Sequence, residues 1–251
     1  MQFRDLHYTE KPLVIANAWD VSSAKYFSDM GFKAVATSSA ALADTQGFTD
    51  GENIPFDLLL QIVGRMKSQV SVPLSVDMER GFSNSTDGLL ANIEQLCKIG
   101  VSGINLEDSG FTGPEPLLPV EMAAGRIADI KDFLRRRGLD IFINARIDAF
   151  IRKYPNAREE TIKRAKAYAA AGADGVFPIT MHKEDDVRAV TAACSIPVNV
   201  VSMQELPDFE TLALWGVRRV SMGSTLYRSL QADLRKKIET VKAERSFRNI
   251  F

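Results

Sequence analysis

Two short acidic stretches of the sequence place carboxylates at spacings that suit metal-ion chemistry. Asp77 and Glu79 follow the run 71–76, and Glu107 is followed directly by Asp108 at the end of another apolar run. Alternate residues of a strand point to one side, so Asp77 and Glu79 are expected to face the same space. Three or four converging carboxylates, with no histidine or cysteine nearby, would make an oxygen-only site for Mg²⁺ or Mn²⁺. A solvated acidic rim is the alternative interpretation.

A second set of residues has the chemistry of an anion site. Arg146 comes shortly after the apolar run 141–143, where its guanidinium would neutralise the acidic cluster or clamp a substrate carboxylate. A structural salt bridge is the alternative for this arginine. Residues 38–40 would present backbone N–H groups to an anion, or form a plain turn. Ser224, before the last helical stretch, is a phosphate candidate or, more simply, a helix N-cap.

A repeated pattern of helix, glycine and short apolar run positions these residues. A glycine just after a helix adopts the left-handed conformation that closes the helix and begins the turn into a strand. The glycines in this position are Gly31, Gly100, Gly138, Gly172 and Gly216. Three further apolar runs, at 13–16, 71–76 and 195–200, bring the strand candidates to eight.

Strands that alternate with amphipathic helices indicate βαβ units and a parallel sheet. Eight units in 251 residues, with no linker between them, predict an α/β protein with one domain over residues 1–251, a single (β/α)8 barrel. An open doubly wound sheet is the alternative, weakened because no Gly-x-Gly-x-x-Gly follows the first strand. Active sites of such barrels lie at the C-terminal ends of the strands. The polar residues expected there are Asn17, Asp20, Ser38, Ser39, Asp77, Glu79, Glu107, Asp108, Asn144, Arg146, Asp148, Thr180, Asn199 and Ser221.

Composition and charge argue against several classes of partner. Lys and Arg number 31 against 32 Asp and Glu, a formal net charge of -1, which gives no electrostatic case for nucleic acid or an anionic membrane. No window approaches the roughly 20 consecutive apolar residues of a membrane span, and the first residues lack the pattern of a signal peptide. Two cysteines are too few for a disulfide framework or a zinc ribbon. The sequence therefore predicts a cytoplasmic protein with a small-molecule partner.

In order and spacing, these motifs resemble the isocitrate lyase and phosphoenolpyruvate mutase superfamily. The matching stretches, from the first strand to the sixth, are 17–20 with 23–24, 36–40, 47–52, 72–82, 103–109, 144–149 and 172–175. The resemblance implies a (β/α)8 barrel whose C-terminal helix is often swapped between subunits. It also implies a homo-oligomer, either a dimer or a dimer of dimers.

The same resemblance implies roles for individual residues. Mg²⁺ would bind a small 2-oxo acid or its enolate, with Asp77 as the direct ligand and neighbouring carboxylates holding metal-bound water. The candidate catalytic residues are Arg146, Glu107 and Asp50, the candidate substrate-binding residues are Ser38, Ser39, Ala40, Arg146 and Asn199, and the candidate metal residues are Asp77, Glu79 and Glu107.

Departures from the superfamily pattern concern the proton donor. Its lyases carry a Lys-(Lys/Arg)-Cys-Gly-His segment after the fourth strand, whereas the loop 109–119 here has no Cys, Lys or His, and the Lys and Asn of the mutases are missing too. The glycines and prolines of 110–119 predict a mobile lid. Arg80 adds a positive charge that would favour a diacid. Cys97 and Cys194 are expected at the opposite end of the barrel, too far away to donate a proton.

Three functions are consistent with these residues. The first is a Mg²⁺-dependent lyase or decarboxylase acting on a small 2-oxo or 2-hydroxy di- or tricarboxylate through an enolate. The second is a phosphonomutase of the phosphoenolpyruvate type, which rearranges a P–C bond. The third is a barrel that binds a 2-oxo acid without turnover. The sequence favours the first.

Overall fold

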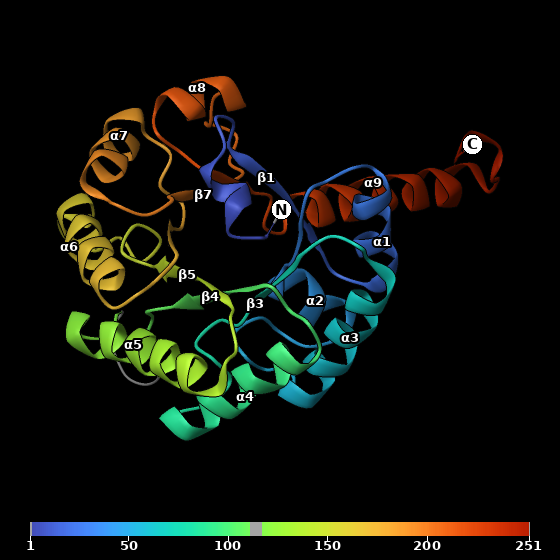
Figure 1. Ribbon diagram of the computed structural model, residues 1–251. Coiled ribbons are helices and arrows are strands. Elements are labelled where there is room, and N and C mark those ends of the chain that lie inside the picture. The colour runs from blue at the N-terminus through green and yellow to red at the C-terminus, as the bar shows by residue number, and fades with distance from the viewer. Residues whose placement is uncertain (1, 111–116, 251) are drawn as a thin grey trace.

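Eight parallel strands form the centre of the molecule, seen end-on in Figure 1. The computed structural model describes residues 2–110 and 117–250. The strands are β1 (Leu13–Ala18), β2 (Val35–Thr37), β3 (Leu74–Asp77), β4 (Gly103–Glu107), β5 (Phe142–Ile147), β6 (Gly175–Pro178), β7 (Asn199–Val201) and β8 (Arg219–Ser221). Their order is β6-β5-β4-β3-β2-β1-β8-β7, and a parallel bridge between Val176 and Val198 nearly closes the ring. The predicted (β/α)8 barrel is therefore confirmed, and the open doubly wound sheet is wrong.

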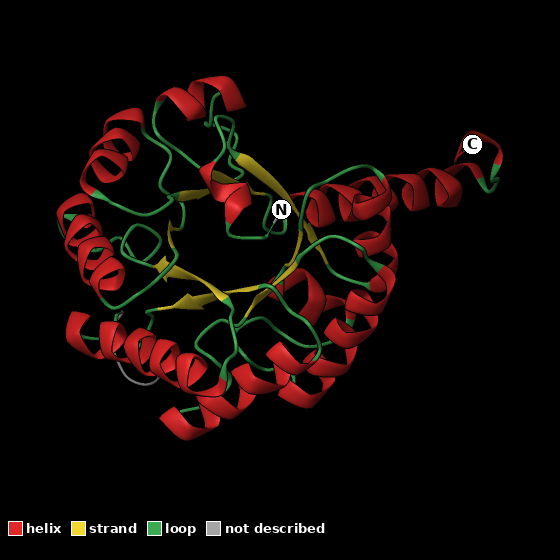
Figure 2. Ribbon diagram, in the orientation of Figure 1, coloured by secondary structure: helices red, strands yellow, loops and turns green. Residues whose placement is uncertain are grey.

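Helices cover the outside of the strands (Figure 2). They are α1 (Val21–Asp29), α2 (Ser39–Thr45), α3 (Phe56–Gln69), α4 (Thr86–Lys98), α5 (Val120–Arg137), α6 (Ala157–Ala170), α7 (Glu184–Ala193), α8 (Phe209–Leu214) and α9 (Thr225–Glu244), with 3₁₀ turns η1 (Asp5–Tyr8) and η2 (Arg248–Ile250). The outer end of α9 extends away from the barrel in Figure 1. Within the described residues, no helix is long and apolar enough to cross a membrane.

The glycine signals in the sequence mark the real helix ends. All five glycines predicted to close a helix have positive φ, between 64° and 95°. Gly138 illustrates the consequence: it caps α5 in the left-handed conformation and its N–H donates to the carbonyls of Leu134 and Arg135. Because the chain reverses so sharply there, β5 can begin four residues later, at Phe142.

The N-terminal segment closes the bottom of the barrel with aromatic side chains. Phe3 packs edge-on against Phe142, with 5.4 Å between ring centroids, and a Cβ at Gly103 would lie only 2.5 Å from the Phe3 ring. His7 stacks on Phe142 at 4.1 Å and is almost fully buried. This burial lowers the pKa of His7 to about 3. The opposite, C-terminal end of the barrel is left to form the site.

Candidate active site

The two carboxylate oxygens of Asp77, the last residue of β3, differ in their hydrogen bonding. Its Oδ2 accepts a hydrogen bond from the Ser39 hydroxyl at 2.9 Å, and its backbone N–H donates to the Thr37 hydroxyl at 2.9 Å. Its Oδ1 is buried and has no hydrogen-bond partner within the described part of the chain. Burial raises the pKa of Asp77, while the positive charge of Arg146 opposes the shift. A buried carboxylate oxygen without a donor is suited to bind a cation.

Arg146 is paired with carboxylates on both sides. Its Nη1 lies 2.9 Å from Glu107 Oε2, its register neighbour on β4, and its Nε and Nη2 donate to Asp148 at 2.7 and 3.1 Å. Burial alone would lower the pKa of Arg146, but Glu107, Asp148 and Asp77 raise it above its ordinary value. These contacts engage three of the five N–H groups of a guanidinium. Arg146 is therefore a fixed cation whose remaining N–H groups suit an anion.

Glu79 is placed at the site by a turn rather than by the strand. The expectation that it shares a strand face with Asp77 is wrong, because β3 ends at Asp77 and Glu79 adopts a left-handed backbone with φ of 46°. The turn nevertheless buries its side chain, which is 5% exposed. Burial and the charges of Asp77 and Asp50 raise the pKa of Glu79 to about 8. Glu79 therefore stays mostly protonated at neutral pH when no cation is bound.

The carboxylates do not form a ready-made metal cage. Within residues 2–110 and 117–250, no three Asp, Glu, His or Cys side chains come together as metal ligands. Asp77, Glu107 and Asp50 do lie close enough for their charges to raise the pKa of Glu79, so the expected acidic cluster is present. Its role as a set of metal ligands stays a prediction, and Glu107 is paired with Arg146 and accepts a hydrogen bond from Ser109. Asp77 Oδ1 stays the candidate for a direct ligand, and Mg²⁺ would suit such a site because it usually keeps several waters. Asp50 is exposed but lies near enough to act electrostatically on Asp77.

The predicted anion turn lies at the beginning of α2. Ser38 is the N-cap of this helix, and its hydroxyl accepts a hydrogen bond from the Ala41 N–H, so its side chain serves the helix. Ser39 instead donates to Asp77. The cradle formed by Ser38, Ser39 and Ala40 around a carboxylate stays a prediction.

Asn199 and Arg80 differ from expectation in their surroundings. Asn199 begins β7 rather than ending it, pairs in register with Arg219 and is 1% exposed. The expectation that Asn199 lies at the C-terminal end of its strand is therefore wrong, and a direct substrate contact does not follow from this position. Arg80 pairs with Glu52 at 3.2 Å, which offsets the charge that was expected to select a diacid.

Two other predicted features can be placed in the structure. Cys97 is the penultimate residue of α4 and Cys194 directly follows α7, so both lie at helix ends that lead into strands, as predicted. Ser224 occupies the N-cap position of α9 but makes no side-chain capping bond. Most of the predicted lid, residues 111–116, lies outside the described residues.

Asp108 belongs to a buried network behind the site. Its carboxylate accepts hydrogen bonds from the Tyr168 hydroxyl at 2.6 Å, from Arg164 at 3.0 Å and from the Asp148 N–H at 2.9 Å. Burial raises the pKa of Asp108, and its hydrogen-bond partners oppose the shift. Asp108 thus holds the end of β5, which carries Arg146, in place. The sequence signal for its partners is their spacing of four residues along α6, which puts Arg164 and Tyr168 on one face.

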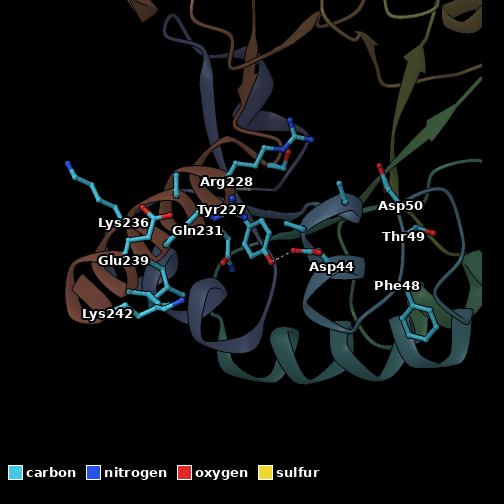
Figure 3. A pocket seen from close by; sticks show the side chains of 17 residues that line it. Asp44, Phe48, Thr49, Asp50, Tyr227, Arg228, Gln231, Lys236, Glu239 and Lys242 are labelled. Atoms are coloured by element: carbon cyan, nitrogen blue, oxygen red, sulfur yellow. Dashed lines mark hydrogen bonds between the residues drawn. The ribbon is translucent and has the colours of Figure 1, made fainter. Parts of the chain in front are cut away.

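A large groove lies beside this cluster rather than over it. A groove of about 1090 Å³ runs between α2, the loop 48–50 and α9. Figure 3 shows Asp50 and its neighbours on one side of it and the polar residues of α9 on the other, with Tyr227 donating a hydrogen bond to Asp44. Ala40 and Asp50 line it, whereas Asp77 and Arg146 do not. The groove is therefore a neighbour of the acidic site, bounded by a helix that projects from the barrel.

A family model described as phosphoenolpyruvate phosphomutase matches residues 3–242, nearly the whole chain. The chain belongs to the phosphoenolpyruvate mutase/isocitrate lyase superfamily. The superfamily resemblance drawn from the motifs is thereby confirmed, and the protein is an enzyme of this superfamily.

Members of the superfamily resemble the chain over most of its length. An uncharacterized protein of Mycobacterium tuberculosis is 34% identical over 227 residues, covering 90% of this chain and 83% of that protein. The 2-methylisocitrate lyase of Shewanella oneidensis is 30% identical over 206 residues, covering 79% and 68%. A solved structure from Burkholderia cenocepacia J2315 has a TM-score of 0.89 at 38% identity, covering 94% of this chain and 97% of that one.

Proposed function

We propose that the protein is a Mg²⁺-dependent lyase or decarboxylase that acts on a small 2-oxo or 2-hydroxy di- or tricarboxylate through an enolate. The observation that carries this proposal is Asp77 Oδ1 at the barrel mouth, which is buried without a hydrogen-bond partner in the described chain and lies in the electrostatic field of Arg146. The Asp77 oxygen suits a hard cation, and the Arg146 guanidinium suits an anion. A chelated 2-oxo acid presents both charges side by side.

The side chains around Asp77 divide the work of binding. Mg²⁺, when bound, would act as a Lewis acid on the 2-oxo group and stabilise charge that develops on its oxygen. Asp77 would hold it through Oδ1, while the Ser39 hydroxyl fixes the orientation of the carboxylate. Arg146, fixed by Glu107 and Asp148, would bind a substrate carboxylate through its remaining N–H groups.

Named relatives support this reaction class. An oxaloacetate decarboxylase, a 2-methylisocitrate lyase and a phosphoenolpyruvate phosphomutase are among them. The mutase activity is the second candidate, because the family model that matches the chain carries that description. Both activities would use the same cation and anion positions, so the product separates them.

The test is a product assay with Mg²⁺ over a panel of small 2-oxo and 2-hydroxy di- and tricarboxylates. We expect release of a short 2-oxo acid, abolished by EDTA and by Arg146→Met. Arg158→Met is the matched control, because Arg158 pairs with Asp186 on the outer helices. Phosphoenolpyruvate with Mg²⁺ is assayed beside this panel, and a C–P resonance formed from it by ³¹P NMR, without any C–C cleavage of the panel, would support the mutase instead. Binding of oxalate with no product from either reaction would support a barrel without turnover.

We further propose that the enzyme is a homo-oligomer, a dimer or tetramer, whose subunits meet through α9. Within the described chain, Tyr227 is the buried residue of this helix, while Leu230, Leu234 and Ile238 form a stripe in which each side chain is at least half exposed. Such a stripe normally packs against another protein surface. Light scattering after gel filtration should give a multiple of 27.7 kDa for the wild type. Leu230→Glu with Leu234→Glu should give the monomer, and a monomeric wild type would contradict the proposal.

A further inference from the structure

Arg219 is a buried cation in the middle of the barrel. It begins β8, is 1% exposed, and reaches across the ring so that its Nη2 lies 3.5 Å from Asn105 Oδ1 on β4. In the strand order β4 and β8 are four strands apart in either direction, so this contact spans the barrel. Within the described residues, Nε and Nη1 have no hydrogen-bond partner and no carboxylate forms an ion pair with the guanidinium.

A comparison with Arg164, the other buried arginine of the described chain, shows that the lack of a carboxylate partner at Arg219 is unusual. Arg164 pairs with Asp108 at 3.0 Å and with Glu160 at 2.8 Å, so its charge is neutralised where it lies. A buried charge without such partners is costly to the fold. Burial lowers the pKa of Arg219 to about 10, which still leaves it charged at neutral pH.

Arg219 and Asp77 are close enough to interact electrostatically. Asp77 is the carboxylate whose charge favours the charged form of Arg219. Asn105, which Arg219 contacts, is the register neighbour of Asp77 and also accepts a hydrogen bond from Asn144 at 2.9 Å. The Arg219 guanidinium therefore lies inside the barrel, below the C-terminal ends of β3 and β4, and out of reach of a substrate at the mouth. Charges act strongly on one another in this poorly solvated interior.

We propose that Arg219 is a positioning residue of the active site, a fixed positive charge below Asp77 that strengthens binding of the anionic 2-oxo acid and weakens binding of Mg²⁺ alone. This inference rests on the proposed function. A fixed charge needs no reorganisation, so it acts with opposite sign on the two partners: it attracts the acid and repels the free cation. The enzyme would then bind metal and acid jointly rather than hold the metal beforehand.

The test is calorimetry of two titrations, Mg²⁺ alone and oxalate at saturating Mg²⁺, on the wild type and Arg219→Met. We expect the variant to bind Mg²⁺ about threefold more tightly and oxalate about tenfold more weakly. Arg219→Lys, which keeps a charge, should restore both affinities in part. Arg218→Met is the matched control: it removes the same charge one residue away, from a side chain that lines a surface pocket, and should alter neither affinity.

A folded Arg219→Met that changes neither affinity, or changes both in the same direction, overturns the inference and leaves the proposed function standing. If the methionine variant does not fold by circular dichroism, Arg219→Gln carries the test, because it keeps a donor for Asn105 without the charge. A wild type that binds no oxalate in the presence of Mg²⁺ overturns the proposed function and the role of Arg219 with it.

Discussion

Replacing Glu79 by glutamine is expected to change how the stability of the metal-free enzyme depends on pH. Glu79 is 5% exposed, and burial together with Asp77 and Asp50 raises its pKa from 4.5 to about 8. Between these two values the folded protein binds a proton that the unfolded chain has released. Stability contributed at this position is therefore full below pH 4.5 and is lost as the pH rises through about 8.

The size of the effect follows from the two pKa values. They differ by about 3.5 units, and each unit corresponds to about 1.4 kcal/mol, so ionising Glu79 in the folded protein costs at most about 5 kcal/mol. Glutamine has nearly the same shape and does not ionise. Wild type and Glu79→Gln should therefore have similar free energies of unfolding near the acid end of the range. The variant should be more stable by several kcal/mol on the alkaline side of the Glu79 pKa.

Urea unfolding followed by circular dichroism, in EDTA and at several pH values across this range, measures the difference. Subtracting the two curves removes the other titrating groups, which both proteins share. Glu121→Gln, on an exposed position of α5, controls for the loss of a carboxylate. A difference that stays constant with pH, or that shrinks as pH rises, would refute the reasoning.

Three further changes test other parts of the structure. His7→Phe should flatten the acid side of the stability curve, because the neutral, buried His7 has a pKa of about 3 and wild-type stability is lost as pH falls below about 6.5; unfolding curves of unchanged acid sensitivity would count against it. Cys97→Ala with Cys194→Ala should leave the steady-state rate within a few-fold, since both thiols lie at helix ends that lead into strands, and a loss by orders of magnitude in a folded protein would disprove this placement. Arg164→Met should lower the free energy of unfolding by about 3–5 kcal/mol, because Asp108 would lose its buried cation; an unchanged urea midpoint would speak against that pairing.

The architecture could be predicted because its signals are local. A glycine at the end of an amphipathic stretch, followed by an apolar run, occurs five times along the chain, and the left-handed φ of Gly31 and Gly216 shows that these glycines end helices as expected. Together with three apolar runs that do not follow such a glycine, they leave few arrangements other than a barrel for a chain of this length. The position of Asp77 was predictable for the same reason, since it is the last residue of a buried strand.

Other features of the site depend on geometry that residue types do not reveal. Where a strand ends decides whether Glu79 continues its face or turns, and a short β7 places Asn199 at its beginning. Asp108 pairs across to α6, a partner 56 residues away. The sequence does contain a signal for Arg219: it is two residues from Ser221, and this spacing puts both side chains on the same face of a strand. What the spacing could not show is that the guanidinium crosses the barrel.

The most direct test of the proposed active site is calorimetry of oxalate binding in the presence of Mg²⁺, on the wild type and on Asp77→Asn. Asparagine keeps the size of the side chain but removes the charge that would hold the cation, so the barrel should stay intact by circular dichroism. The account predicts Mg²⁺-dependent oxalate binding to the wild type and at least about tenfold weaker binding to the variant. Equal affinities in two folded proteins would contradict the assignment of Asp77 as the metal ligand.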